Sequence, residues 1–319
     1  MNKPTTLKKY WHPLIFPMSL FTVWLWSFPM YGPLLTITGK TANKLFLIYL
    51  ISHFMGLILN SIYIDFLYYR DIFNYSKEIK QMIFISSVVG LLTIIFPYVS
   101  MSFCFMIMIL MGFLSGRIVI FYLYYLSTGN RIENKGVILG IIFFAAGTIS
   151  VIFLLLTVGK WMFILNGLFL LAPFSLLKNS LNNEFENTKR NIKISETKKI
   201  YWLALILLII MFYVGGGLMY SLSYKDIYSS GGNNFDFGFL FYMFAAIPVG
   251  FLADKKGRKH LINIGLTFMG IGFLLIFLYN RTDNLGLGFL QIGFAAMDIF
   301  VFLTLIDWNG VIKNNKFIG

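Results

Sequence analysis

The chain has 319 residues, of which 58% are hydrophobic and only 12% are charged. A soluble domain carries about 25% charged residues, so this composition excludes an ordinary soluble globular protein. Apolar runs of about 20 residues, the length that crosses a bilayer as a helix, recur along the chain. The net charge of +13 would fit a nucleic-acid-binding protein, but the basic residues lie in short loops between the apolar runs. We therefore interpret the chain as a multi-pass protein of the lipid bilayer, with no nucleic-acid partner.

The apolar runs predict ten membrane-spanning helices. They are continuously apolar rather than alternating, which favours helices over a strand barrel. The first run is followed by many similar runs and has no small-residue cleavage site, so it is not a secretory signal. Most of the 26 Lys and Arg residues fall on one side of the membrane, and the positive-inside rule therefore places both termini in the cytoplasm. The predicted helices span residues 13–36, 45–69, 82–98, 101–127, 137–158, 161–177, 200–222, 236–253, 261–279 and 285–306.

The first two predicted helices carry aromatic and titratable side chains in mid-span. Trp24 and Trp26 lie in a helix that also contains several prolines, and prolines allow a membrane helix to bend. We expect these two indole rings either to line a cavity for an apolar cargo or to serve as ordinary interfacial groups. His53, in the second helix, is interpreted either as a proton relay or as a residue that hydrogen-bonds a neighbouring helix.

Arg117 and Asp298 are the clearest charges inside predicted spans. A charge in the hydrocarbon region is costly and usually faces a cavity or a partner. Three interpretations stay open. The two side chains pair across a central cavity, or they bind an anionic substrate and a proton respectively. In the third, each is satisfied separately, or Arg117 lies near the lipid face and snorkels. Cys104 is the only cysteine, which excludes an internal disulfide or a multi-cysteine metal site. We expect neither a bound metal nor a cofactor.

An internal repeat relates the fourth and the tenth predicted helices at an offset of 181 residues. The segments GFLSGRIVIF (112–121) and GFAAMDIFVF (293–302) share glycine, phenylalanine and isoleucine positions. The alignment places Arg117 and Asp298 at equivalent positions of the two halves. A duplicated six-helix unit would have twelve helices, so we expect the second half to be two helices short.

A dense charged segment, GFLADKKGRKH (250–260), lies between the eighth and ninth predicted helices. Gly257 permits a tight reversal of the chain, and Gly250 lets two helices approach closely. Asp254 can accept charge-assisted hydrogen bonds from the start of a neighbouring helix or from Arg258. The alternative is a basic loop that only contacts anionic lipid headgroups.

The corresponding loop of the first half, residues 68–80, is less complete. Asp71 is retained, but Asn74 stands where the second loop has its glycine, and the basic residues are diluted. We therefore expect this loop to serve less well as a helix-to-helix contact than the loop at 250–260.

The helix count, the long polar segment and the charged loop together resemble the major facilitator superfamily of secondary transporters. The family's loop pattern is Gly-x-x-x-Asp-Lys/Arg-x-Gly-Arg-Lys/Arg. It is matched at each position by Gly250, Asp254, Lys255, Gly257, Arg258 and Lys259. The resemblance implies an all-α polytopic membrane fold with a six-helix N-terminal bundle (1–177), a cytoplasmic linker (178–199) and an incomplete four-helix C-terminal bundle (200–319).

The resemblance also implies a permease that moves a small solute by alternating access, and not an enzyme. The loop 250–260 is then expected to act as a gating latch, in a monomer of the bacterial inner membrane with both termini in the cytoplasm. Proton coupling is left open. The candidate residues of the transport path are Arg117, Asp298, His53, Trp24 and Trp26.

Two other functions stay open at this point. A truncated, transport-inactive remnant is suggested by the two missing helices and the diluted loop at 68–80. A flippase for lipid-linked saccharides would share the helix count but would not need the charged loop. A membrane enzyme is disfavoured, because none of the three histidines has a nearby carboxylate that would suggest general-base chemistry.

Overall fold

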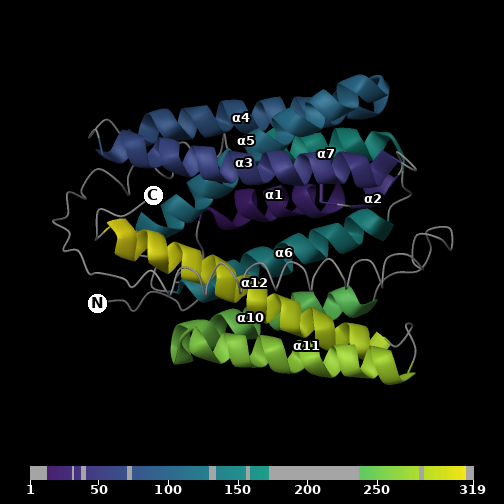
Figure 1. Cartoon of the computed structure of the whole chain (residues 1–319), viewed down its shortest axis with the longest axis vertical. Coiled ribbons are helices and arrows are strands. Elements are labelled where there is room, and N and C mark those ends of the chain that lie inside the picture. The colour runs from purple at the N-terminus through teal and green to yellow at the C-terminus, as the bar shows by residue number, and fades with distance from the viewer. Residues whose placement is uncertain are drawn as a thin grey trace, which may run out of the picture. The chain divides into compact units, whose positions relative to one another are not determined.

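The computed structural model describes residues 13–30, 32–36, 41–69, 74–128, 134–155, 159–171, 237–279 and 284–313. Within these ranges all regular secondary structure is helical, as the apolar runs predict (Figure 1). The predicted helix 200–222 and the polar segment 178–199 lie outside the described residues. The helices are α1 (Ile15–Ser27), α2 (Pro33–Thr36), α3 (Ala42–Tyr69), α4 (Tyr75–Ile95), the short 3-10 helix η3 (Phe96–Tyr98), α5 (Met101–Thr128), α6 (Lys135–Leu155), α7 (Trp161–Leu171), α10 (Phe237–Lys256), α11 (Lys259–Tyr279) and α12 (Asn284–Lys313).

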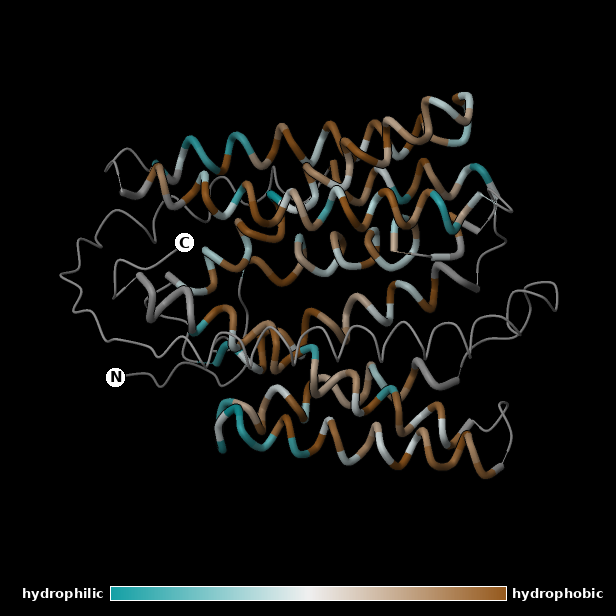
Figure 2. Tube along the Cα trace, viewed as in Figure 1, coloured by the Kyte–Doolittle hydropathy of each residue, from teal (hydrophilic) through white to brown (hydrophobic). Residues whose placement is uncertain are grey.

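Six of the described helices are long and apolar enough to cross a membrane. They are α3, α4, α5, α6, α11 and α12, and α1 and α7 are shorter apolar helices. Figure 2 shows the hydropathy along the chain, with hydrophobic residues along most of each helix and hydrophilic residues at several helix ends. The all-α, multi-pass membrane architecture predicted from the sequence is thus confirmed for the described part of the chain.

The helices belong to two compact units. The first unit contains α1 to α5 and α7, and the second contains α10 to α12 together with residues 132–148, which include the start of α6. From Ile149 onwards α6 belongs to the first unit. Although α6 precedes the polar linker, its first two-thirds therefore group with helices of the second sequence half. The bundle boundaries at residues 177 and 200 stay predictions.

The first predicted helix is interrupted in the structure. We expected one helix over 13–36, but α1 ends at Ser27 and only the short α2 follows from Pro33. Pro29 and Pro33 explain the break, because proline lacks an amide proton and disfavours helical backbone in the residue before it. Phe28 accordingly leaves the helical region, with φ −125° and ψ −79°.

The helix α4 begins seven residues earlier than the apolar pattern predicts, at Tyr75 instead of residue 82. Asn74 caps it, since its side chain accepts a hydrogen bond of 3.2 Å from the amide of Lys77. Asparagine is a preferred N-cap residue. The polar first turn was missed because hydropathy detects the apolar part of a helix and not its capped end.

Candidate functional site

Asp254 lies near the end of α10 and binds the first amides of α6. One carboxylate oxygen accepts a hydrogen bond of 2.9 Å from the amide of Gly136, and the other accepts one of 2.8 Å from the amide of Val137. The first amides of a helix have no partner inside the helix and carry partial positive charge. The carboxylate therefore caps a helix that lies 117 residues away in the sequence.

Arg258 and Asp307 extend this contact into an acid–base network. The Nε and Nη2 atoms of Arg258 each lie 2.8 Å from Oδ2 of Asp307, and its Nη1 lies 3.7 Å from Asp254. Lys135, the first residue of α6, lies 3.9 Å from the other oxygen of Asp307. The two-point contact of a guanidinium with a carboxylate fixes orientation as well as charge. The network thus joins the start of α6 to the ends of α10 and α12 and the turn before α11.

Two glycines give this network its geometry. Gly257 has φ +88°, a left-handed backbone that glycine adopts without steric cost, and it reverses the chain between α10 and α11. Gly250 lies against Gly136, and a Cβ atom at either position would collide with the carbonyl oxygen of the other. The close approach brings Asp254, one turn further along α10, within hydrogen-bonding reach of the α6 amides.

The first-half loop differs from this arrangement. Asn74, at the position equivalent to Gly257, has φ −128° and ψ 111° and serves as the N-cap of α4. Asp71, the retained acid of this loop, lies outside the described residues. At the one position that can be compared, the two loops therefore use different backbone conformations.

Arg117 is almost completely buried in the first unit and forms an ion pair with Glu78 of α4. The same guanidinium nitrogen also lies 3.3 Å from the side-chain oxygen of Gln81, and the guanidinium lies 4.9 Å from the ring centroid of Tyr63. Sequence reasoning did not single out Glu78. A signal was available, because a charge inside a span requires a partner and Glu78 is an acid on the preceding helix.

Asp298 lies on α12 in the second unit and accepts a hydrogen bond of 2.8 Å from the hydroxyl of Tyr242 on α10. Tyr242 packs edge-on against Phe143 of α6, which packs edge-on against Phe302. The Asp298 side chain is only partly buried, and its second oxygen has no hydrogen-bond partner among the described residues. Of the three interpretations of Arg117 and Asp298, the geometry favours the one in which each has a separate partner.

His53 forms a polar cluster between α3 and α5. Its Nδ1 atom and the Tyr49 hydroxyl each lie 2.8 Å from the hydroxyl oxygen of Ser115, which in turn donates to the carbonyl oxygen of Gly112. A serine hydroxyl has a single proton, so Ser115 donates to only one of these groups at a time, and the role of His53 Nδ1 depends on its tautomer. This is the hydrogen bond to a neighbouring helix that we weighed against a proton relay.

The two tryptophans lie in different environments. Trp24 is fully buried, its indole nitrogen donates a hydrogen bond of 2.9 Å to Thr93 of α4, and its ring packs against Phe21 and Tyr49. Trp26 is half-buried. In this structure Trp24 therefore fills the core of the first unit, where a buried indole commonly finds such a partner.

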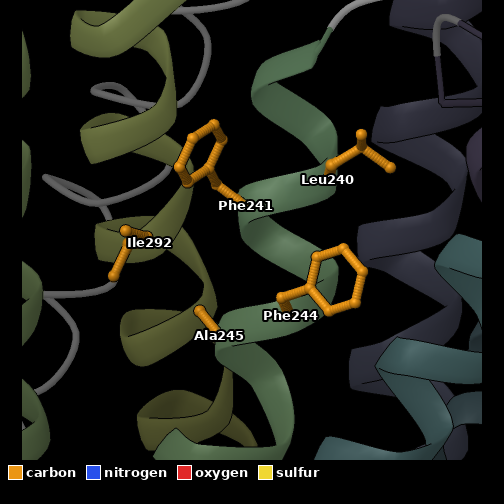
Figure 3. Close-up of a pocket in the computed structure, with 5 residues that line it drawn as sticks. All are labelled: Leu240, Phe241, Phe244, Ala245 and Ile292. Atoms are coloured by element: carbon orange, nitrogen blue, oxygen red, sulfur yellow. The ribbon is translucent and has the colours of Figure 1, made fainter.

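Two apolar grooves lie elsewhere on the units. The groove in Figure 3 is lined by residues of α10 and α12, namely Leu240, Phe241, Phe244, Ala245 and Ile292. The second groove, between α3 and α5, is lined by Ile48, Ile51, Ser52, Met55, Met106, Ile109, Leu110 and Phe113. Neither contains a charged residue. Among the described residues no group of three or more His, Cys, Asp or Glu side chains could hold a metal ion.

No protein-family model and no curated protein matches the chain in sequence. Solved structures do match in fold. A bacterial homologue of the iron transporter ferroportin, in an outward-facing state with soaked iron, has a TM-score of 0.62 and 15% identity, over 97% of this chain and 87% of that one. A second outward-facing structure of such a homologue has a TM-score of 0.61 and 15% identity, over 96% and 87%. The chain therefore shares the fold of these two structures, an all-helical membrane fold as its sequence predicts.

Proposed function

We propose that the chain is a secondary transporter that moves a small solute across a membrane by alternating access. The observation that carries this proposal is the pair of hydrogen bonds from Asp254 to the first amides of α6, in a fold shared with known transporters. The contact joins a helix of the first sequence half to a helix of the second. It lies at helix ends within the second unit, where withdrawal of the α6 start from α10 would break it and its return would make it.

The acid–base network gives this contact two states. In the state described here Asp254 is bound to the α6 amides, and Arg258 is held by Asp307. If α6 withdraws, Arg258 is near enough to take over the Asp254 charge, since the two groups are already 3.7 Å apart. A latch of this kind opens without leaving a bare carboxylate, which lowers the cost of switching. Transporters of this architecture rock two bundles about a site near the membrane midplane.

The charges inside the membrane favour a positively charged cargo or a coupling proton. Arg117 is committed to Glu78, so its charge is already balanced and offers little to an anionic substrate. Asp298 accepts a hydrogen bond from Tyr242, and its second oxygen has no partner within the described ranges. A partly exposed carboxylate within a span is a functional candidate by default. We propose that Asp298 binds a proton or a cationic group during transport.

A divalent metal ion is the second candidate cargo. It is favoured by the fold shared with a bacterial homologue of an iron transporter, one structure of which contains soaked iron. In this proposal Asp298 supplies one oxygen ligand; within the described ranges no group of three or more His, Cys, Asp or Glu side chains could hold the ion.

The test is uptake by proteoliposomes that contain the full chain. Ferrous iron, manganese and a panel of organic cations are offered with and without a proton gradient, and Asp298→Asn is compared with Tyr242→Phe. We expect Asp298→Asn to reduce uptake of the active cargo at least tenfold and Tyr242→Phe to reduce it by less than tenfold. Silence of the wild-type protein across the whole panel would contradict the proposal, and would favour an inactive chain.

A further inference from the structure

The loop 250–260 carries more positive charge than its acid–base network uses. Arg258 is bound to Asp307 and lies close to Asp254, so its charge is balanced. Lys255, Lys256 and Lys259 are exposed and form no ion pair with the described residues. The charged residues of the loop thus divide into an inner pair, Asp254 and Arg258, that contacts α6 and α12, and an outer set of three lysines.

The turn at Gly257 places these three lysines close together. α10 ends at Lys256 and α11 begins at Lys259, so only two residues separate the helices. The left-handed backbone of Gly257 reverses the chain within that length. The three lysine residues therefore lie at one corner of the backbone, and because like charges repel each other, a counter-charge from outside the described residues would stabilise this arrangement.

The corner lies at one end of a candidate membrane span. The candidate span of α11 runs from Lys259 to Leu278, so the lysines stand where the apolar helix begins. Just inside the boundary, Phe251 and Leu266 expose 52% and 57% of their surface, as side chains in contact with lipid do. Figure 2 shows hydrophilic residues at the corner where α10 and α11 meet and hydrophobic residues along the rest of α11.

The side chain of Lys255 indicates where the turn between α10 and α11 lies relative to the apolar surface. Its Nζ atom lies 5.8 Å from the ring centroid of Phe251, so the side chain folds back toward the apolar surface instead of extending into water. A lysine in this position lays its methylene stem on apolar surface and keeps its ammonium group at the level of the lipid headgroups.

We propose that Lys255, Lys256 and Lys259 form a binding site for the headgroup of an anionic phospholipid. The position of the lysines at the end of a membrane span favours a lipid over a soluble anion, because the acyl chains of a lipid hold its phosphate at that level. The three lysines have no ion-pair partner among the described residues, so a headgroup with net negative charge should bind there more tightly than a zwitterionic one. Basic residues near an anionic membrane surface strengthen binding by on the order of fivefold each. The site is separate from the Asp254 contact and does not depend on the proposed transport activity.

The experiment uses the full chain in phosphatidylcholine vesicles that contain a small fraction of photoactivatable phosphatidylglycerol. After illumination, mass spectrometry measures the fraction of crosslinked lipid on residues 250–265. The triple variant K255Q/K256Q/K259Q is compared with K44Q/K77Q/K80Q, which removes the same charge from exposed lysines at other helix ends. We expect the first variant to lose crosslinking on this segment by roughly 100-fold and the second to keep it.

Three results would overturn the proposal. They are equal crosslinking in the wild type and K255Q/K256Q/K259Q, equal crosslinking by a photoactivatable phosphatidylcholine, and displacement of the lipid by millimolar inorganic phosphate, which would indicate a soluble anion. Asp254→Asn serves as a further control, since it disturbs the proposed latch and leaves the lysines in place. It should retain the lipid signal, so that a failed latch and a failed lipid site are distinguishable.

Discussion

The two membrane charges that the internal repeat places at equivalent positions have different surroundings. Arg117 in the first unit is almost fully buried and paired with Glu78, and its guanidinium also contacts Tyr63 and Gln81. Asp298 in the second unit is partly exposed, and among the described residues its hydrogen-bond partner is Tyr242. The charge of Arg117 is thus balanced by an ion pair, whereas the described residues leave one oxygen of the Asp298 carboxylate able to bind a proton or a cation.

This difference suggests that the Arg117–Glu78 pair matters for folding stability and that Asp298 matters for transport. A buried ion pair adds little net stability compared with apolar packing, but the loss of one partner leaves an uncompensated charge. A carboxylate with one neutral hydrogen bond can instead be neutralised by a proton or a cation. We therefore expect changes at the Arg117 pair to unfold the first unit and changes at Asp298 to stop transport in a folded protein.

The largest effect is expected from Glu78→Ala, which breaks the closed pair. Arg117 would stay buried without its counter-charge, which costs about 3–5 kcal/mol. Thermal unfolding of the detergent-purified protein measures the loss. The double variant E78M/R117M removes both charges and should recover most of the stability. A double variant as unstable as Glu78→Ala would show that the pair is not the reason.

The next effect is expected where α6 meets α10. Gly250→Ala adds a methyl group against the carbonyl oxygen of Gly136, and such overpacking costs about 1–3 kcal/mol. The change Gly270→Ala on α11 is the control, since a Cβ atom at Gly270 meets nothing within 4 Å. Equal melting temperatures for the two variants would argue against the close approach of α6 and α10.

Asp298→Asn tests whether the carboxylate in the second unit is needed for transport in a folded protein. The asparagine amide is similar in size to the carboxylate, and its oxygen can still accept the hydrogen bond from the Tyr242 hydroxyl. We therefore expect the free energy of unfolding to change by less than about 1 kcal/mol. Uptake should nevertheless fall at least tenfold, equivalent to about 1.4 kcal/mol in the transport barrier. A variant that melts like the wild type and transports at the wild-type rate would remove Asp298 from the path.

The smallest effect is expected in the turn of the charged loop. Gly257→Asn should cost less than about 1 kcal/mol, because asparagine tolerates the left-handed region better than other side chains, whereas Gly257→Val should cost more. Thermal unfolding of the two variants measures the difference. Equal costs for asparagine and valine would mean that the positive φ of 88° does not decide the residue at this position.

The parts of the fold that rest on one segment at a time were predictable from the sequence. Hydropathy located the long helices, and the spacing of Gly250, Asp254 and Gly257 predicted a tight turn whose acid contacts a helix start. The contact of Asp254 with the α6 amides agrees with that expectation. Local spacing is informative there because the turn and the helix end are both set by neighbouring residues.

The parts that depend on packing between helices were not predictable. The partners of Arg117 and Asp298 are Glu78 and Tyr242, and each lies on another helix. One sequence does not say which faces meet. The grouping of the start of α6 with α10 to α12 was missed for the same reason. The break after Ser27 was open to prediction from the spacing of the prolines, but the apolar run hid it.

The most direct test of the proposed latch is the reactivity of a thiol at position 137. Val137 is 7% exposed, and its amide binds Asp254. In a Cys104→Ser background, the rate at which a membrane-impermeant maleimide labels Val137→Cys reports how often the α6 start separates from α10. We predict slow labelling with Asp254 in place and labelling at least tenfold faster when Asp254→Asn is added. Equal rates in the two proteins would contradict the account.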